Sequence, residues 1–264
     1  MTRFASLGTG GGPDVWVRSR WVFNCYVFPT ASDGAPLVID CGLPSHAHQI
    51  LRQFSPERAT VVATHTHTDH VGGIPELSAI APAVALPARA EAFARGEAPG
   101  GPRLATVASI APVLRSQAFE LSAVVEAGRA TAVGFGLRGP YASPSPSPVY
   151  LADGPFDLAD GGEAIATPGH TDDSPCLYHA GSRTLCSGDA VLTVDKRAWF
   201  NPERWDDAAT GATEDRLRGL RVDRLLPGHG RPVFGTDLLA TALSATERPT
   251  RRRWSRCTAA RPDR

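Results

Sequence analysis

Three histidines and an aspartate crowd into the six residues from His65 to His70, in the pattern His-x-His-x-Asp-His. They follow the apolar run 60–63, which is typical of a buried β-strand. A strand that ends in such a turn presents polar side chains at one rim of a sheet, with His65 and His67 on the same face because side chains alternate. Neutral imidazoles and carboxylates suit zinc and its first-row neighbours. The stretch therefore predicts a metal site at the end of a buried strand.

Three further candidate ligands stand in loops that follow apolar runs. They are His170 in Pro-Gly-His, Asp189 in Ser-Gly-Asp and His229 in Pro-Gly-His-Gly. Glycine beside each one suits a backbone that turns sharply or approaches another group closely. Together with residues 65–70 they provide five imidazoles and two carboxylates, enough for two metal sites that share an open position for water.

This ordered set of motifs resembles the metallo-β-lactamase-fold hydrolase superfamily. Asp40, in Leu-Val-Ile-Asp-Cys-Gly, matches the first motif of that family, and the resemblance runs from about residue 14 to about residue 240. It implies an α/β fold, the four-layer αββα sandwich of the metallo-β-lactamase fold. The five motifs span one chain and must converge on one site, so we expect a single domain over residues 1–244.

The resemblance also implies a role for each polar residue. His65, His67 and His170 are expected to hold the first metal; Asp69, His70 and His229 are expected to hold the second. Asp189 is expected to bridge the two, and Asp40 to orient the ligand loop without binding metal. The expected cofactors are two divalent ions, Zn²⁺ first, with iron or manganese as alternatives.

Such a centre predicts a hydrolase in which a metal-bridging hydroxide attacks an activated bond. Asp69 is the expected catalytic residue, which receives the proton and passes it to the leaving group. Glyoxalase II-type thioesterases and acyl-lactonases share the full ligand set, whereas β-lactamases of this fold lack a bridging aspartate at this position. The favoured substrate is therefore a thioester, ester or lactone of a small-molecule or carrier-bound acyl group. A phosphodiesterase or nuclease and a non-catalytic metal-binding protein remain as alternatives.

Charge and cysteine content bear on the partners. Residues 245–264 hold seven Arg, one Glu and one Asp, a net charge of +5, while the net charge of the whole chain is zero. The remaining body is thus near −5, which disfavours a nucleic-acid partner, and we expect the Arg-rich tail to be disordered. Five cysteines without a Cys-x-x-Cys pair, no apolar signal core and no membrane-length apolar run predict a cytoplasmic protein without a membrane partner.

Residues 88–148 exceed what the core strands need and predict a helical cap insertion. Helices are expected at 88–95 and 112–127, the second with an apolar stripe that packs against the core. Further expectations are a loop at 190–207 and a closing helix at 236–246, with strands at 149–151, 164–167, 176–179 and 183–187 in one meander. The residues expected to line the substrate pocket are Phe135, Leu137, Tyr141, Trp199 and Phe200.

Overall fold

Two large β-sheets form the centre of the molecule. The computed structural model describes residues 3–8, 12–29, 34–54, 56–136, 140–156 and 161–249. The first sheet has seven strands in sequence order, antiparallel from β1 to β4 and parallel from β4 to β7. These strands are β1 (Ala5–Ser6), β2 (Trp16–Arg20), β3 (Phe23–Phe28), β4 (Leu37–Ile39), β5 (Thr60–Val62), β6 (Ala83–Pro87) and β7 (Val149–Leu151).

The second sheet has six strands in the order β15-β14-β11-β10-β9-β8, and among these pairs only β11 and β14 are parallel. They are β8 (Gly154–Pro155), β9 (Gly162–Ala166), β10 (Pro175–His179), β11 (Thr184–Gly188), β14 (Arg224–Pro227) and β15 (Val233–Phe234). A separate hairpin pairs β12 (Val191–Val194) with β13 (Arg197–Phe200).

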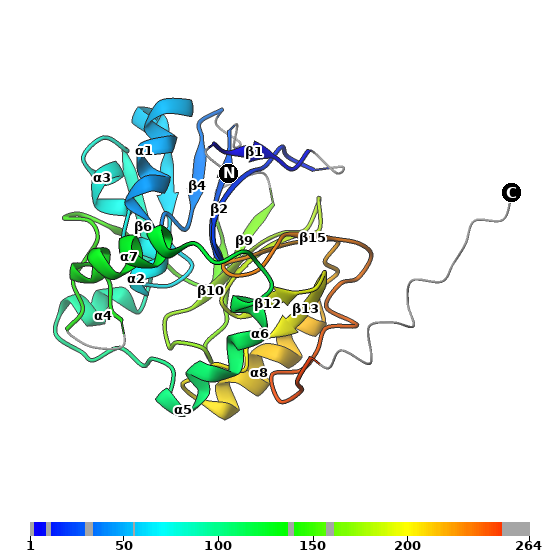
Figure 1. Cartoon of the computed structure of the whole chain (residues 1–264). Coiled ribbons are helices and arrows are strands. Elements are labelled where there is room, and N and C mark those ends of the chain that lie inside the picture. Colours follow the sequence, from blue (N-terminus) through cyan, green and yellow to red (C-terminus); the bar gives the residue numbers. More distant parts are fainter. Residues whose placement is uncertain are drawn as a thin grey trace, which may run out of the picture.

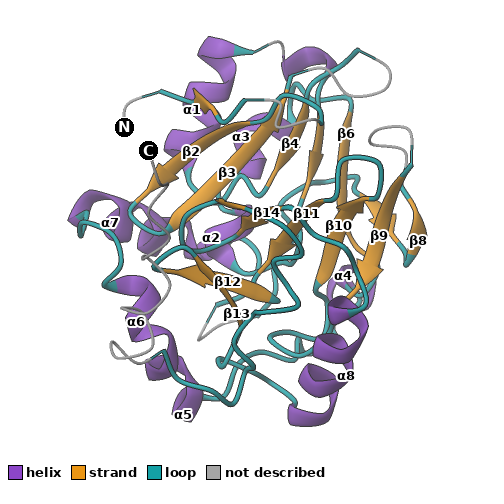
Figure 2. Ribbon diagram, turned by 90° about the vertical axis from the view of Figure 1, so that its right-hand side faces the viewer, coloured by secondary structure: helices purple, strands orange, loops and turns teal. Residues whose placement is uncertain are grey.

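Alternating side chains on the strands build the layers. In β3, Tyr26 and Phe28 point into a core between the two sheets, together with Leu177 and Leu226 of the second sheet. Cys25 and Val27, one residue out of phase, point to the opposite face, where they join a core with the outer helices. The second sheet packs its outer face against α8 (Asp207–Arg218). Figures 1 and 2 show helices outside both sheets, which makes the chain the expected four-layer αββα sandwich.

The helices of the first half cover the outer face of the first sheet. They are α1 (Pro44–Gln53), η1 (Pro56–Arg58), α2 (Thr68–Val71), α3 (Ile74–Ser78) and α4 (Ala90–Ala94). The proline in the first turn of α1 suits a position whose N–H has no intrahelical acceptor. Asp206 caps α8 by accepting a hydrogen bond from the backbone N–H of Ala209. No helix in the described ranges has the length and apolar character that crossing a membrane requires.

The insertion is a series of short helices, and the expected continuous helix over 112–127 is wrong. The structure has α5 (Leu104–Val107), η2 (Ala108–Ile110), α6 (Ala111–Leu114), α7 (Leu121–Arg129) and η3 (Ala130–Ala132). The break after Leu114 has a tertiary cause, because Trp21 donates from Nε1 to the Leu114 carbonyl and from its backbone N–H to the Glu120 carboxylate. Leu121 and Val125 of the predicted stripe are 64% and 43% exposed, so they do not pack against the core.

Three other expectations fail in detail. Residues 236–246 form turns in place of a closing helix. The strand at 149–151 joins the first sheet, parallel to β6, and so does not belong to the meander of the second. Residues 190–200 are the β12–β13 hairpin, where a loop was expected. Residues 250–264, most of the predicted disordered tail, lie outside the described residues.

Candidate metal centre

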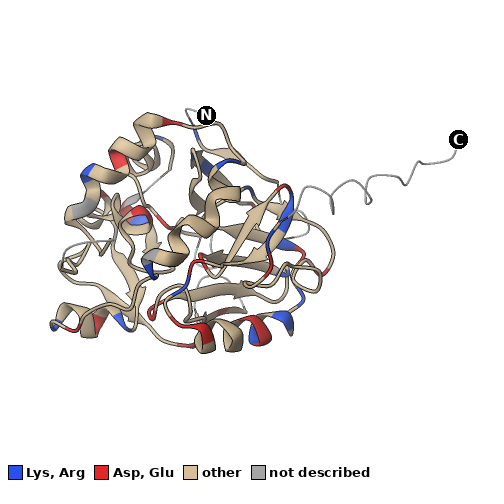
Figure 3. Ribbon diagram, turned by 60° about the horizontal axis from the view of Figure 1, so that its bottom comes forward, with Lys and Arg blue, Asp and Glu red and all other residues tan. Residues whose placement is uncertain are grey.

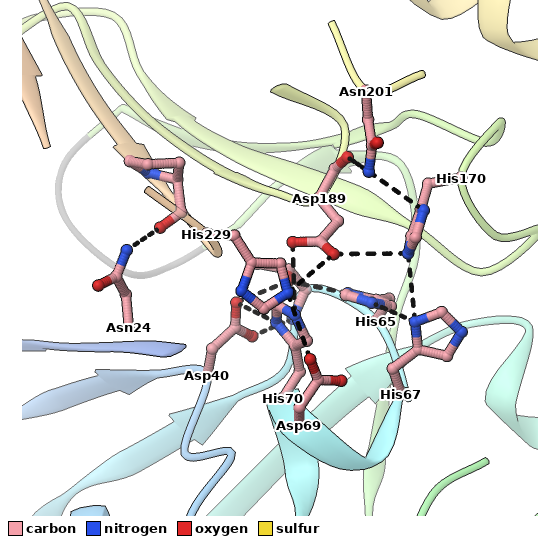
Figure 4. Close-up of polar contacts among 12 residues, drawn as sticks. Asn24, Asp40, His65, His67, Asp69, His70, His170, Asp189, Asn201 and His229 are labelled. Carbon is pink, nitrogen blue, oxygen red and sulfur yellow. Dashed lines mark hydrogen bonds and ion pairs between the residues drawn. The ribbon is translucent and has the colours of Figure 1, made fainter. Parts of the chain in front are cut away.

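The seven predicted ligands meet where the two sheets face each other, at the ends of four strands. His65 follows β5, His67 is the residue before α2, and Asp69 and His70 lie within α2. From the second sheet, His170 follows β9, Asp189 follows β11 and His229 follows β14. Figure 4 shows these side chains pointing toward one another from both sheets. Strands β9, β11 and β14 run in the same direction, so their carboxyl ends lie at one edge of the second sheet, which explains why loops far apart in sequence converge.

Three imidazole nitrogens form the first group. His65 Nε2 lies 3.0 Å from His67 Nδ1, which lies 3.2 Å from His170 Nε2. Tetrahedral zinc with Zn–N bonds near 2.0–2.1 Å separates its ligand nitrogens by about 3.3 Å, so this spacing fits one ion. His170 donates from Nδ1 to the Glu203 carbonyl at 2.8 Å, so its Nε2 carries a lone pair directed at the group.

The second group combines Asp69, His70 and His229. Asp69 Oδ2 lies 3.2 Å from His229 Nε2. His229 donates from Nδ1 to the Val22 carbonyl at 3.1 Å, and His70 directs Nδ1 to Asp40 Oδ2 at 3.0 Å. Both rings therefore keep Nε2 for the interior of the site.

Asp189 lies between the two groups. Its Oδ2 is 3.4 Å from His170 Nε2 and 3.3 Å from His229 Nε2, and its Oδ1 is 3.4 Å from His70 Nε2. His70 Nε2 and Asp189 Oδ1 are buried and have no hydrogen-bond partner. Buried polar atoms without a partner are rare and need an explanation, and a cation between them supplies one. The donor set thus fits two first-row metal ions, with Asp189 in a position to contact both.

Asp40 and Asp173 accept hydrogen bonds from the loop 64–70, which carries four of the predicted ligands. Asp40 accepts hydrogen bonds from the backbone N–H and hydroxyl of Thr64, at 2.8 and 2.7 Å, in addition to that from His70. Its backbone φ of +57° is in the left-handed region, which an aspartate tolerates better than most residues. Asp173 accepts in the same way from the backbone N–H and hydroxyl of Thr66, at 2.9 and 2.6 Å. A supporting role was expected for Asp40, whereas Asp173 was not among the predicted site residues.

Without metal, protons on His70 and His229 balance the charges of the neighbouring carboxylates. Burial lowers the pKa of His65 and His170, and it lowers the pKa of His67 to about 3. The three imidazoles of the first group are therefore neutral. Burial also opposes charge on His70, but the Asp189 and Asp40 carboxylates raise the pKa of His70 to about 10. The Asp189 and Asp69 carboxylates likewise raise the pKa of His229. Bound cations can take over the role of these protons.

Gly228 shows how tightly the centre is packed. A Cβ atom at this position would lie 2.5 Å from Asp189 Oδ1 and 2.5 Å from His70 Cε1, closer than real Cβ contacts allow. The Pro-Gly-His-Gly motif therefore needs glycine before His229 because the backbone passes directly over two of the ligands.

A cavity of about 500 Å³ opens onto the metal centre, and the insertion builds much of its wall. The predicted ligands His67, Asp69, His170, Asp189 and His229 line its polar end. The apolar wall consists of Trp21, Val22, Phe23, Ala98, Pro99, Pro102, Val107, Ile110, Leu114, Ala127 and Phe135.

Of the four described residues expected to line the pocket, Phe135 alone does so. Tyr141 packs behind it, against Phe93 at 5.6 Å between ring centroids. Trp199 and Phe200 do not line the cavity, because both are fully buried in separate hydrophobic cores beneath the β12–β13 hairpin. Leu137 lies outside the described residues.

Sequence reasoning missed Trp21, Phe23 and Glu203 at the site. The two aromatic residues flank the β2–β3 turn, and the Phe23 ring lies 5.6 Å from the His229 ring. A pair of large aromatic residues at a turn is a signal that could have found them. Glu203 lines the cavity on the segment that follows β13, and burial together with the Asp189 carboxylate raises the pKa of Glu203 to about 8.

Comparison with known proteins agrees with this geometry. The metallo-beta-lactamase superfamily profile matches residues 21–229. The chain is 27% identical over 246 residues to the probable metallo-hydrolase YflN of Bacillus subtilis, covering 82% of this chain and 83% of that protein. It is 32% identical to the acyl-coenzyme A thioesterases MBLAC2 of Bos taurus and Homo sapiens, where the match covers 67% of this chain and 58% of each relative.

Solved structures show the same fold. A TTHA1623 structure in a di-iron-bound form has a TM-score of 0.52 and 22% identity, over 83% of this chain and 92% of that one. A beta-lactamase domain protein from Burkholderia ambifaria has a TM-score of 0.55 and 18% identity, over 88% and 72%. The family resemblance expected from the sequence is therefore confirmed, and this metallo-hydrolase belongs to the metallo-beta-lactamase superfamily.

Proposed function

We propose that this protein is a dinuclear metal-dependent thioesterase that acts on acyl thioesters. The observation that carries the proposal is the cavity, which joins a seven-residue metal centre to a wall made mainly of apolar side chains from the insertion and the β2–β3 turn. Both ends of the cavity suit a thioester, because metals at the polar end would polarise its carbonyl and the apolar wall would contact its acyl chain.

The chain's own residues have distinct tasks in this reaction. The His and Asp residues of the two groups would hold two cations, which would polarise the carbonyl and lower the pKa of a bound water. Asp69, whose side chain is 28% exposed, contacts His229 through Oδ2, so that Oδ1 can accept the proton of the attacking water. As the C–S bond breaks, the same carboxyl returns the proton to the departing thiolate, which leaves an acid and a thiol.

The wall of the cavity favours an acyl group over a phosphodiester. Among the described lining residues there is no Lys or Arg, whereas phosphate binding depends on such residues. Figure 3 shows basic and acidic residues interspersed over the elements in view. The MBLAC2 relatives are named as acyl-coenzyme A thioesterases, which agrees with this choice for the substrate.

The test is an acyl-length series. Val107 and Leu114 line the cavity and are half-buried, so Val107→Ala and Leu114→Ala shorten the wall. Leu114 also packs against the core around Trp199, so the unfolding free energy of the variant is measured beside its activity. Each truncation removes roughly 1–2 kcal/mol of apolar contact with a long chain. The double variant should lose on the order of 100-fold in kcat/KM for a decanoyl thioester and little for an acetyl thioester.

Leu121→Ala is the matched control, because Leu121 belongs to the same insertion but is mostly exposed and does not line the cavity. It should leave the chain-length profile unchanged. Parallel profiles for the wild type and the double variant would contradict an acyl-binding wall. Turnover that survives metal removal, and that does not increase when metal is added back, would contradict the metal chemistry.

A further inference from the structure

Glu203 is a buried carboxyl group without a partner in the reaction cavity. It is 8% exposed and lines the cavity beside the predicted ligands. Asp40, Asp69 and Asp189 each contact an imidazole, but the Glu203 side chain has no hydrogen bond or ion pair to any residue in the described ranges. A carboxyl group that faces a cavity without a protein partner is free to accept a hydrogen bond from a molecule bound there.

The backbone holds Glu203 firmly in this position. Its N–H donates to Asn201 Oδ1 at 2.9 Å, and its carbonyl accepts from His170 Nδ1 at 2.8 Å. Asn201 donates in turn to the Asp189 carbonyl at 2.8 Å, so the segment is tied to two predicted ligands. The next carbonyl, that of Arg204, accepts from the backbone N–H of Arg103 in the insertion at 3.2 Å. The side chain therefore leaves a fixed backbone that links the metal centre to the cavity wall.

Among the described residues, no protein group donates a hydrogen bond to the Glu203 carboxyl. Its charged neighbours are the Asp189 and Asp69 carboxylates and His229, whose Nε2 already lies 3.3 and 3.2 Å from those two carboxylates. The remaining described lining is mainly apolar, with no Lys or Arg. A donor for this carboxyl must therefore come from what occupies the cavity, which is water in the free protein and a bound ligand during turnover.

We propose that Glu203 is a specificity-determining residue that accepts a hydrogen bond from an N–H or O–H group of the substrate, close to the scissile carbonyl. The inference rests on the proposed thioesterase function and narrows the substrate to thioesters that carry such a donor. Both a carboxylate and a neutral carboxyl group present an acceptor oxygen, so the contact is available in either protonation state. The donor can lie on the thiol side, as an amide, or on the acyl side, as a hydroxyl.

Three thioesters separate these sources. Butyryl ethanethiol carries no donor, butyryl N-acetylcysteamine carries an amide N–H on the thiol side, and 3-hydroxybutyryl ethanethiol carries an O–H on the acyl side. The wild type should prefer at least one donor-bearing substrate by roughly 10-fold or more in kcat/KM, since sites built for a hydrogen bond discriminate strongly against analogues that lack it.

Glu203→Leu removes the acceptor at similar size, and Glu203→Gln keeps one acceptor oxygen. The Leu variant should abolish the preference, mainly through a higher KM for the preferred substrate. The Gln variant should retain part of the preference. Asp207→Asn is the control, because its carboxylate is on the same segment but is 58% exposed and outside the cavity lining. If Glu203→Leu does not fold, Glu203→Ala serves in its place.

The inference alone would be overturned by equal kcat/KM for all three substrates in the wild type, or by an unchanged preference in the Leu variant. Loss of a metal ion from both Glu203 variants in elemental analysis would also overturn it, because Glu203 would then be a ligand. No turnover of any thioester by metal-loaded wild type would overturn the proposed function together with this inference.

Discussion

Replacing Asp40 by Asn should weaken the second metal site although Asp40 is not expected to bind metal. The carboxylate accepts three hydrogen bonds, two from Thr64 and one from His70 Nδ1. An Asn amide has a single acceptor oxygen, so its NH₂ group must face a donor. If it faces His70, the imidazole proton has to move to Nε2, the atom that lies 3.4 Å from Asp189 and points into the metal site.

The size of the effect follows from this mismatch. Outer contacts of this kind are worth about 10–100-fold in metal affinity, or about 1.4–2.7 kcal/mol. If the amide turns the other way, a buried backbone N–H of Thr64 loses its acceptor, at a cost to stability of about 1–3 kcal/mol. Asp40→Asn should therefore lose one metal ion in competition with a chromophoric chelator, while the first group retains its ion.

Asp173→Asn is a control matched in chemistry and burial. Asp173 is 3% exposed against 2% for Asp40, and it also accepts from the backbone N–H and hydroxyl of a threonine in the ligand loop. Its second oxygen has no partner, so an Asn can keep both hydrogen bonds and turn its NH₂ group away. This variant should bind metal normally. Equal loss of metal in both variants, or normal binding by Asp40→Asn, would refute the reasoning.

Three further measurements test other parts of the structure. Elemental analysis of the wild type should give two metal ions per chain, and Asp189→Ala should retain at most one with little turnover; two retained ions would exclude a bridging role. Burial raises the pKa of Asp173 from 3.8 to about 6, so its contribution to stability is complete below pH 4 and falls as pH rises through 6. In metal-free protein, Asp173→Asn should thus gain about 3 kcal/mol relative to the wild type between pH 4 and pH 8 in urea unfolding, and a constant difference would contradict the raised pKa. Leu121→Ser should change the unfolding free energy by less than about 0.5 kcal/mol, whereas a large loss would mean that its exposed face is packed in solution.

The metal centre was more predictable from the sequence than the cavity. His65 to His70 are close in sequence, and a single strand end brings them together, while His170, Asp189 and His229 each follow a recognisable strand with a glycine turn. The αββα layers followed from the family resemblance carried by these motifs.

The cavity wall depends on contacts that no local pattern reveals. Trp199 was expected there because it follows a ligand, but the β12–β13 hairpin turns its ring inward, where Nε1 donates to the Ser244 carbonyl at 3.1 Å. Trp21 reaches the cavity from a position 48 residues before Asp69 in the chain, and its contact with Leu114 also breaks the predicted helix. Helix propensity and apolar spacing contain no information about such a partner.

The division of the predicted ligands between the sheets has a consequence for the lifetime of the protein. Four of the seven come from the first sheet and three from the second, so neither half of the sandwich holds a complete site. Bound ions would act as cross-links between the halves, in addition to the apolar core between the sheets. At a free metal concentration 100 times Kd, one such site adds about 2.7 kcal/mol to the stability of the folded state. The supply of metal would then determine how often the two halves separate and how readily proteases degrade the chain.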